Sequence, residues 1–218
     1  MDEHALRNLC RSIDWSDADH AAPVTQAALN DIAASLDFMR YLVRQPLTDD
    51  TLLGLCERFD FVDKLVLFAD DVSGVRLRLH IFGQGYFDRP HNHRWSYTAR
   101  ILAGSYTHRL FGTDTELLST AVDPRTLRPL LVRTETVCSS YTLHYSMVHS
   151  VTAAPNTVSL ILRGPAERDA FSILDRVTGE RWTQYGAKLE TAETKRSRAL
   201  LRNEVEECIV HLERLHLA

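Results

Sequence analysis

Two histidines separated by one residue, His91 and His93, are the first feature of the sequence that could do chemistry. Side chains at positions i and i+2 of a strand point to the same face, so two imidazoles at this spacing can meet one metal ion. Pro90 cannot donate a ladder hydrogen bond and favours the start or edge of a strand. Gly83 and Gly85 favour a bend just before the pair. Taken alone, the pair is also typical of two turn or surface histidines.

A third histidine, His149, precedes a loop containing Pro155 and Asn156. Three neutral imidazoles leave a divalent metal with its full +2 charge, because no carboxylate ligand lowers it. Such a site should attract an anionic, chelating substrate. Iron(II) could there bind substrate and dioxygen together, whereas zinc would serve as a Lewis acid. His144 and Glu135 are alternative ligands.

The first segment resembles the first motif of the cupin superfamily, in which a Gly is followed after five residues by His-x-His, a Glu and a later Gly. Gly85, His91, His93 and Gly104 occupy these places. The expected glutamate is missing, since residues 89–113 contain no acidic side chain. The substrate would therefore face a more positive metal.

The segment around His149 resembles the second cupin motif, in which a His follows a tight turn and an Asn comes later. The resemblance implies a mainly β fold, a cupin (jelly-roll) barrel with N-terminal helices and a C-terminal helix. It also implies that His91, His93 and His149 bind one metal inside the barrel. Fe(2+) is the metal expected, and Zn, Ni or Mn would also fit three histidines.

Residues 61–165 are similar in particular to thiol dioxygenases of the cysteine dioxygenase type, which insert oxygen into a substrate sulfur. The relay run Ser-Leu-His-x-Tyr of that family here reads Ser-Leu-Ile-Leu-Arg at 159–163, and its cross-linked cysteine falls at Thr98. The resemblance therefore implies an iron-dependent dioxygenase whose substrate is not cysteine. Arg163 replaces the relay tyrosine and is expected near the metal as a substrate anchor.

Alternation along two strands suggests further pocket residues. In residues 75–82, Arg76, Arg78 and His80 share one face, which could line the barrel and clamp a carboxylate or could be a solvated outer face. In the expected strand 97–103, Tyr97 and Arg100 lie on opposite faces. Arg100 could be a cation of the pocket or a charge on the surface. We assign catalytic roles to Arg163, Tyr97 and Arg78. The histidines His80 and His108 are taken as structural.

The elements that must position these residues follow from hydrophobic periodicity. Helix spacing predicts one helix over 26–43, closed by Pro46, a short one from Asp50, and a helical tail over 188–216. Short β-branched and aromatic runs between turn residues predict an antiparallel sandwich or barrel. The expected strands are 64–69, 75–82, 97–103, 106–111, 129–137, 140–145, 157–163 and 170–175, with a hairpin turn at 71–74.

We expect one domain, in which helical residues 1–60 pack on a barrel of residues 61–186 and residues 187–218 add the C-terminal helix. The apolar stripe of that helix could dock on the barrel or form a homodimer. The net charge of −4 and the lack of a basic excess argue against a nucleic-acid partner. Four scattered cysteines argue against a disulfide framework. With no secretory signal and no long apolar run, a cytoplasmic location without membrane attachment is expected.

The function expected is that of a non-haem iron(II) oxygenase acting on a small anionic or amino-acid-like substrate with dioxygen. The alternative is an oxygen-independent cupin lyase or isomerase, in which Tyr97 moves protons beside a Lewis-acid metal. A non-catalytic ligand-binding cupin is a third hypothesis.

Overall fold

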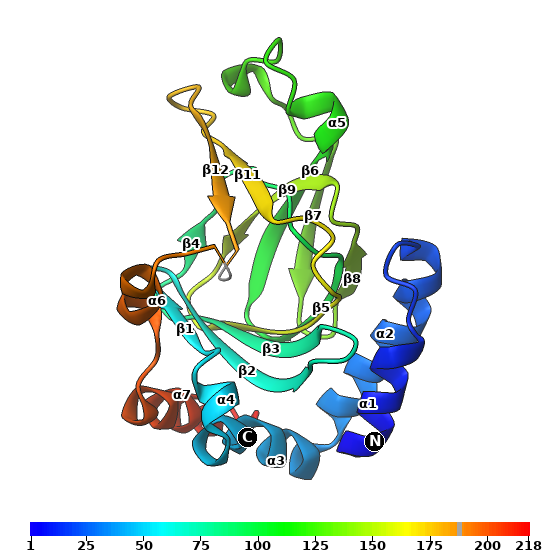
Figure 1. Cartoon of the computed structure of the whole chain (residues 1–218), viewed down its shortest axis with the longest axis vertical. Coiled ribbons are helices and arrows are strands. Elements are labelled where there is room, and N and C mark those ends of the chain that lie inside the picture. The colour runs from blue at the N-terminus through cyan, green and yellow to red at the C-terminus, as the bar shows by residue number, and fades with distance from the viewer. Residues whose placement is uncertain (187–188) are drawn as a thin grey trace.

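The computed structural model describes residues 1–186 and 189–218 (Figure 1). Its helices are α1 (Glu3–Ser12), α2 (Ala18–Ala34), α3 (Leu36–Thr48), α4 (Asp50–Leu53), α5 (Asp114–Leu117), α6 (Ala192–Arg198) and α7 (Arg202–Arg214), with a 3-10 turn η1 at Pro124–Thr126. Its strands are β1 (Glu57–Phe59), β2 (Val62–Asp70), β3 (Val75–Phe82), β4 (Tyr86–Phe87), β5 (Tyr97–Ala103), β6 (Ser105–Thr113), β7 (Leu131–Thr136), β8 (Ser140–Leu143), β9 (Met147–Ala153), β10 (Thr157–Arg163), β11 (Ala170–Leu174) and β12 (Arg181–Tyr185).

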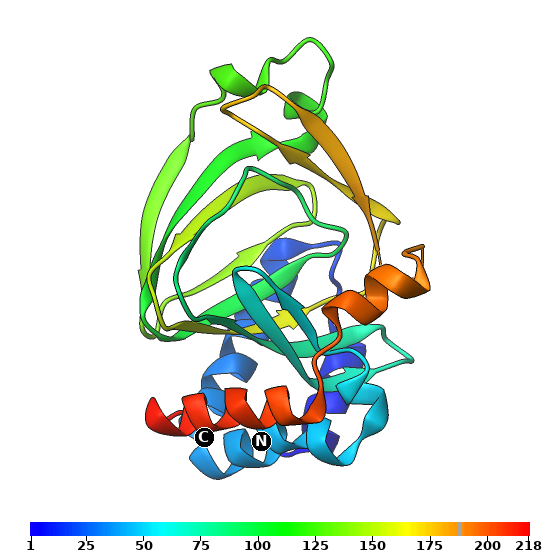
Figure 2. The same ribbon diagram turned by 90° about the vertical axis from the view of Figure 1, so that its left-hand side faces the viewer.

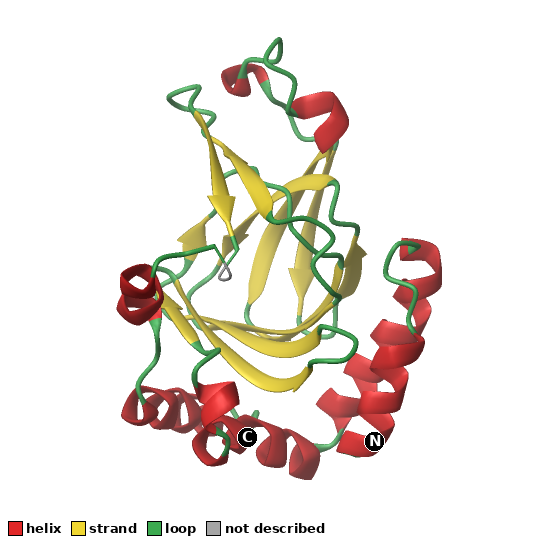
Figure 3. Ribbon diagram, viewed as in Figure 1, coloured by secondary structure: helices red, strands yellow, loops and turns green. Residues whose placement is uncertain are grey.

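The strands form two larger antiparallel sheets and one hairpin. The first sheet has the order β1-β2-β3-β10-β5-β8, the second has the order β4-β9-β6-β7, and β11 pairs only with β12. Within the described residues these ladders do not close into one barrel. Helices and strands each make up about a third of the chain, so the fold is mixed rather than mainly β. The expected helices at both ends are present (Figure 3).

One face of the six-stranded sheet packs on the terminal helices. Figure 2 shows the blue N-terminal helices and the red α7 on the same side of the strands. In β3, Leu77 and Leu79 are fully buried in this layer, as are Leu160 and Leu162 in β10. Each such leucine contributes about 2 kcal/mol through burial, so this interface fixes the position of the sheet. The apolar stripe of α7 joins the same core, which makes α7 a docked helix.

The opposite face of the same sheet carries the residues of interest. Because side chains alternate along a strand, Arg76, Arg78 and His80 of β3 point away from the helices, into a cavity between the sheets. The interpretation of this face as a solvated outer surface is therefore wrong. The turn at 71–74 is confirmed, since Asp70 pairs with Val75 across it and Gly74 has a φ of +70°.

The helix predicted over 26–43 is two helices. Ser35 ends α2 and caps α3, where its hydroxyl accepts a hydrogen bond from the N–H of Phe38 at 3.3 Å. Pro46, expected to close the helix, lies inside α3. The helical tail expected over 188–216 is broken at residues 199–201, because Ala199 pairs with Glu57 of β1; residues 187–188 lie outside the described chain. No helix of the described residues is long and apolar enough to cross a bilayer.

Candidate metal centre

Backbone pairing places the first and third histidines side by side. The N–H of His91 donates to the carbonyl of His149 at 2.9 Å, and the reverse bond has the same length. Residues directly opposite in an antiparallel pair project their side chains to the same face. His93 follows two residues later, and its N–H donates to Tyr145 at 3.2 Å. The His-x-His pair thus lies in an extended segment between β4 and β5, not within a regular strand, whereas His149 lies in β9.

The residue between the two histidines holds the segment in this alternation. Asn92 is buried, and its Nδ2 donates to the Oδ2 of Asp114 at 2.9 Å. Its Oδ1 accepts from the N–H of Ser172 in β11 at 2.8 Å. With Asn92 fixed on the far side, His91 and His93 must both face inward.

The three imidazoles converge. One nitrogen from each of His91, His93 and His149 lies within 4.8 Å of the others, and these form a potential metal-ligand group in the described residues. The Nε2 atoms of His93 and His149 are 2.7 Å apart. Nitrogens bound to one ion at about 2.1 Å lie roughly 3 to 3.5 Å apart, so small side-chain rotations suffice to accommodate it.

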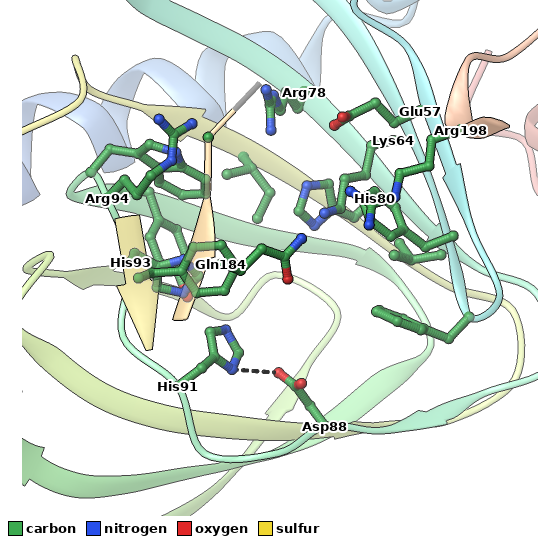
Figure 4. Close-up of a pocket in the computed structure, with 18 of the residues that line it drawn as sticks. Glu57, Lys64, Arg78, His80, Asp88, His91, His93, Arg94, Gln184 and Arg198 are labelled. Carbon is green, nitrogen blue, oxygen red and sulfur yellow. Dashed lines mark ion pairs between the residues drawn. The ribbon is translucent and has the colours of Figure 1, made fainter. Parts of the chain in front are cut away.

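The remaining ring nitrogen of His91 is held from outside the group. Its Nδ1 lies 3.0 Å from the Oδ2 of Asp88 and 2.8 Å from the carbonyl oxygen of Arg89 (Figure 4). An imidazole that donates through Nδ1 presents a free lone pair on Nε2, which is the usual arrangement of metal-binding histidines. Asp88 therefore fixes which nitrogen of His91 faces the centre.

His149 is held in the same way by a second histidine. Its Nδ1 lies 3.0 Å from the Nε2 of His108, and the Nδ1 of His108 lies 3.7 Å from Oε1 of Glu135. Glu135 is fully buried behind His108 and outside the three-histidine group, so its placement as a ligand is wrong. His144 is also outside the group and contacts Ser146 at 2.7 Å.

The protonation states suit a metal. Burial, with the neighbouring histidines, holds the pKa of His93 and of His149 well below the usual value, so both are neutral at pH 7. Burial also opposes a charge on His91, but the Asp88 carboxylate outweighs it and raises the pKa of His91. Metal ions bind neutral imidazole, and a +2 ion would displace that proton. The donor set therefore fits a divalent transition metal.

The histidines open into a cavity of about 670 Å³ between the sheets. Its wall near His93 is Trp95, whose ring stacks on the imidazole with 4.9 Å between centroids. The hydroxyl of Tyr97 lies 3.5 Å from the Nε2 of His149, and Tyr97 is buried. Arg78 lines the cavity, and its guanidinium carbon lies 5.9 Å from the Trp95 ring. Two of the three residues assigned catalytic roles therefore reach the site.

The two other predicted arginines, Arg163 and Arg100, do not line the cavity. Arg163 is not among the residues that line the cavity, and its Nη1 donates to the carbonyls of Gly164 at 2.7 Å and Gly74 at 3.2 Å. It therefore holds the end of β10 to the β2–β3 turn. Its guanidinium carbon also lies 5.6 Å from the Trp95 ring, and its role as a substrate anchor stays a prediction. Arg100 points to the helix side, where it contacts Asn30 and donates to the carbonyl of Cys138 at 3.1 Å.

Sequence reasoning missed several residues of this site. Trp95 stands two residues after His93, a spacing that a strand-like pattern could have revealed, whereas Asp88, three residues before His91, follows no strand alternation. The interpretation of His108 as a structural histidine omits its contact with His149, although alternation along 106–111 leaves it free to face inward. Lys64 was overlooked because it interrupts an apolar strand, yet it pairs with His80 across β2 and β3.

Comparisons with known proteins give structural neighbours only. No family model matches the chain, and no curated protein matches it. The chain is similar to KdgF from Halomonas sp. (14% identity over 52% of this chain and 89% of that one, TM-score 0.39) and to an RmlC-like cupin from Shewanella frigidimarina (14%, 52% and 86%, TM-score 0.39). It is also similar to ectoine synthase from P. lautus (12%, 50% and 67%, TM-score 0.37). Similarity at this level identifies no activity.

Proposed function

We propose that this chain is a metal-dependent enzyme in which His91, His93 and His149 bind iron(II). When bound, the iron supplies the chemistry of a non-haem oxygenase that uses dioxygen to oxidise a small anionic substrate. The observation that carries the proposal is the convergence of three imidazoles, the buried His149 and the half-buried His91 and His93, with one nitrogen of each within 4.8 Å of the others. The departures from the thiol dioxygenase relay at residues 159–163 support a substrate other than cysteine.

The residues of the chain have distinct tasks in this proposal. Asp88 and His108 orient two of the ligand histidines. Arg78 attracts and orients an anionic group of the substrate, because a guanidinium that is partly shielded from solvent binds oxyanions strongly. Trp95 and the buried tyrosine Tyr97 wall off the reacting end from water. Exclusion of water strengthens each of these electrostatic contacts.

A lyase or isomerase that needs no oxygen is the second candidate. The observation in its favour is the Tyr97 hydroxyl, 3.5 Å from the Nε2 of His149. Burial holds the pKa of Tyr97 well above its usual value, so the phenol stays protonated and can give a proton to a substrate anion beside a Lewis-acid metal.

The experiment that tests both is elemental analysis followed by oxygen-electrode measurements. Protein prepared anaerobically and loaded with Fe(2+), Zn(2+), Ni(2+) or Mn(2+) is mixed with a panel of small acids, amino acids and thiols. Iron-dependent oxygen uptake supports the oxygenase, and turnover in oxygen-free buffer supports the lyase. No metal above background in wild-type protein, with no change on His91→Ala or His149→Ala, would refute both.

A further inference from the structure

Four cationic side chains gather at one part of the cavity wall: Lys64 of β2, Arg76 and Arg78 of β3, and Arg94. We refer to these four residues as the cationic cluster. None of them takes part in the ion pairs of the described residues. Figure 4 shows Lys64, Arg78 and Arg94 pointing into the same cavity as His91 and His93.

Arg78 is the most deeply buried member. Only 8% of it is exposed, and its Nε has no hydrogen-bond partner among the described residues. Nearby, the Nε2 of His80 is also buried without such a partner. Buried polar groups are nearly always satisfied, so unpartnered nitrogens on two side chains that line the cavity indicate a polar ligand.

The three carboxylates among the described residues that line the cavity form no ion pair with this cluster. Glu190 lies 3.0 Å from Arg198, and Asp88 lies 3.0 Å from His91. Glu57 is then the one remaining carboxylate among the described residues that line the cavity. Burial, together with neighbouring cations, lowers the pKa of Lys64 to about 8 and that of Arg78 to about 10, although the Glu57 carboxylate opposes the shift in both.

The cluster and the three-histidine group share a wall. The Trp95 ring lies 4.9 Å from the His93 ring and 5.9 Å from the Arg78 guanidinium carbon, so His93 and Arg78 are at most about 11 Å apart. Arg76 and Arg78 stand at i and i+2 on one face of β3, which separates their Cα atoms by roughly 7 Å. That spacing allows both guanidinium groups to bind opposite sides of one multivalent anion.

We propose that the cationic cluster is a second anion subsite, which takes a doubly negative group such as a phosphate, a phosphonate or paired carboxylates. Resting on the proposed function, this makes the substrate a two-ended anion. One end faces the three histidines, and the dianionic end binds Arg76 and Arg78, with Lys64 and Arg94 adding charge. A compact dianion is favoured over a single carboxylate because several unpaired cations face the same space.

The test is titration of metal-free, full-length protein by calorimetry with inorganic phosphate, malonate or acetate at low ionic strength. Phosphate or malonate is expected to bind at least tenfold more tightly than acetate. Arg78→Gln is expected to weaken that binding by tenfold or more. The matched control is Arg100→Gln, which removes an arginine from the helix-facing side of β5 in the same sheet and should leave the affinity unchanged. Tighter binding of phosphate would indicate a phosphate or phosphonate group, and tighter binding of malonate would indicate paired carboxylates.

A second variant guards against misfolding of the first. Lys64→Gln should weaken phosphate binding and, without anions, raise the melting temperature, because it removes one of several buried like charges. A purely structural lysine would give a lower melting temperature. The metal-site variant His149→Ala should keep wild-type phosphate affinity, which separates this proposal from the enzymatic one. Equal binding of phosphate, malonate and acetate, or equal affinities in Arg78→Gln and Arg100→Gln, would overturn the subsite.

Discussion

The contact between His108 and His149 predicts a graded effect on metal binding. With its Nε2 3.0 Å from the Nδ1 of His149, His108 selects the tautomer whose Nε2 lone pair faces the centre. Replacing such a supporting group costs metal affinity about 10- to 100-fold, or about 1.4 to 2.8 kcal/mol. His108→Leu should therefore weaken iron or zinc binding by that factor. Removal of a ligand in His149→Ala should abolish stoichiometric binding.

Competition with a chromophoric chelator measures these affinities, and melting curves of the metal-free proteins check that each variant folds. The matched control is His144→Ala, which removes a histidine that contacts Ser146 and lies outside the three-histidine group. Its metal affinity should equal that of wild type. If His108→Leu binds metal as tightly as wild type, or if His144→Ala loses metal as His149→Ala does, the assignment of ligands and supporting residues is refuted.

Three further predictions concern stability and are checked by urea unfolding. Asp70→Asn should cost about 2 kcal/mol, because the 1%-exposed carboxylate accepts hydrogen bonds from two arginines of α1 and from Ser73. Hydrogen bonds from those groups, with Arg11 the largest cause, hold the pKa of Asp70 well below its usual range. The contribution of Asp70 to the free energy of unfolding is therefore complete above about pH 4 and is lost as the pH falls further. A difference in unfolding free energy between wild type and Asp70→Asn that stays constant down to about pH 2 would contradict this. Gly104→Ala should cost about 3 kcal/mol, since φ is +70° and a Cβ would lie 2.7 Å from the Cα of Thr157. Leu160→Ala should cost about 3 kcal/mol, because the side chain is fully buried beneath the helices.

Strands whose two faces have contrasting environments could be predicted from the sequence. The runs 75–82, 97–103 and 157–163 coincide with β3, β5 and β10. In β3 the alternation of leucine with arginine reflects a helix layer on one side and the cavity on the other. β10 is buried on both faces, and its residues 160–162 are consecutive apolar side chains. In these strands the burial of each face determines which residue types occur there, so the pattern of residue types predicts the strand.

The sequence did not predict elements in which polar or functional residues interrupt the hydrophobic pattern. β9 carries His149 in the run MVHSVTA, where a functional histidine and a serine obscure the pattern of a strand. The break at Ser35 divides a continuous apolar stripe, because a serine cap is compatible with either a helix interior or an end. The contact of His108 with His149, and of Glu135 with His108, depends on the pairing of β6 with β7 and β9, a tertiary register that no local pattern specifies.

The site has no carboxylate among its three expected ligands, but two carboxylates lie behind histidines of the site. Asp88 lies behind His91, and Glu135 lies behind His108, so the two carboxylates approach the centre through imidazole rings. Carboxylates in this position make the ligating imidazoles more basic and better donors, yet they leave the inner coordination shell neutral. An ion bound by three neutral nitrogens keeps its full charge toward the open cavity, where Arg78 and its neighbours add more positive charge. If both proposals hold, the site would select its ligand by negative charge at both ends, a requirement that a ligand glutamate would weaken.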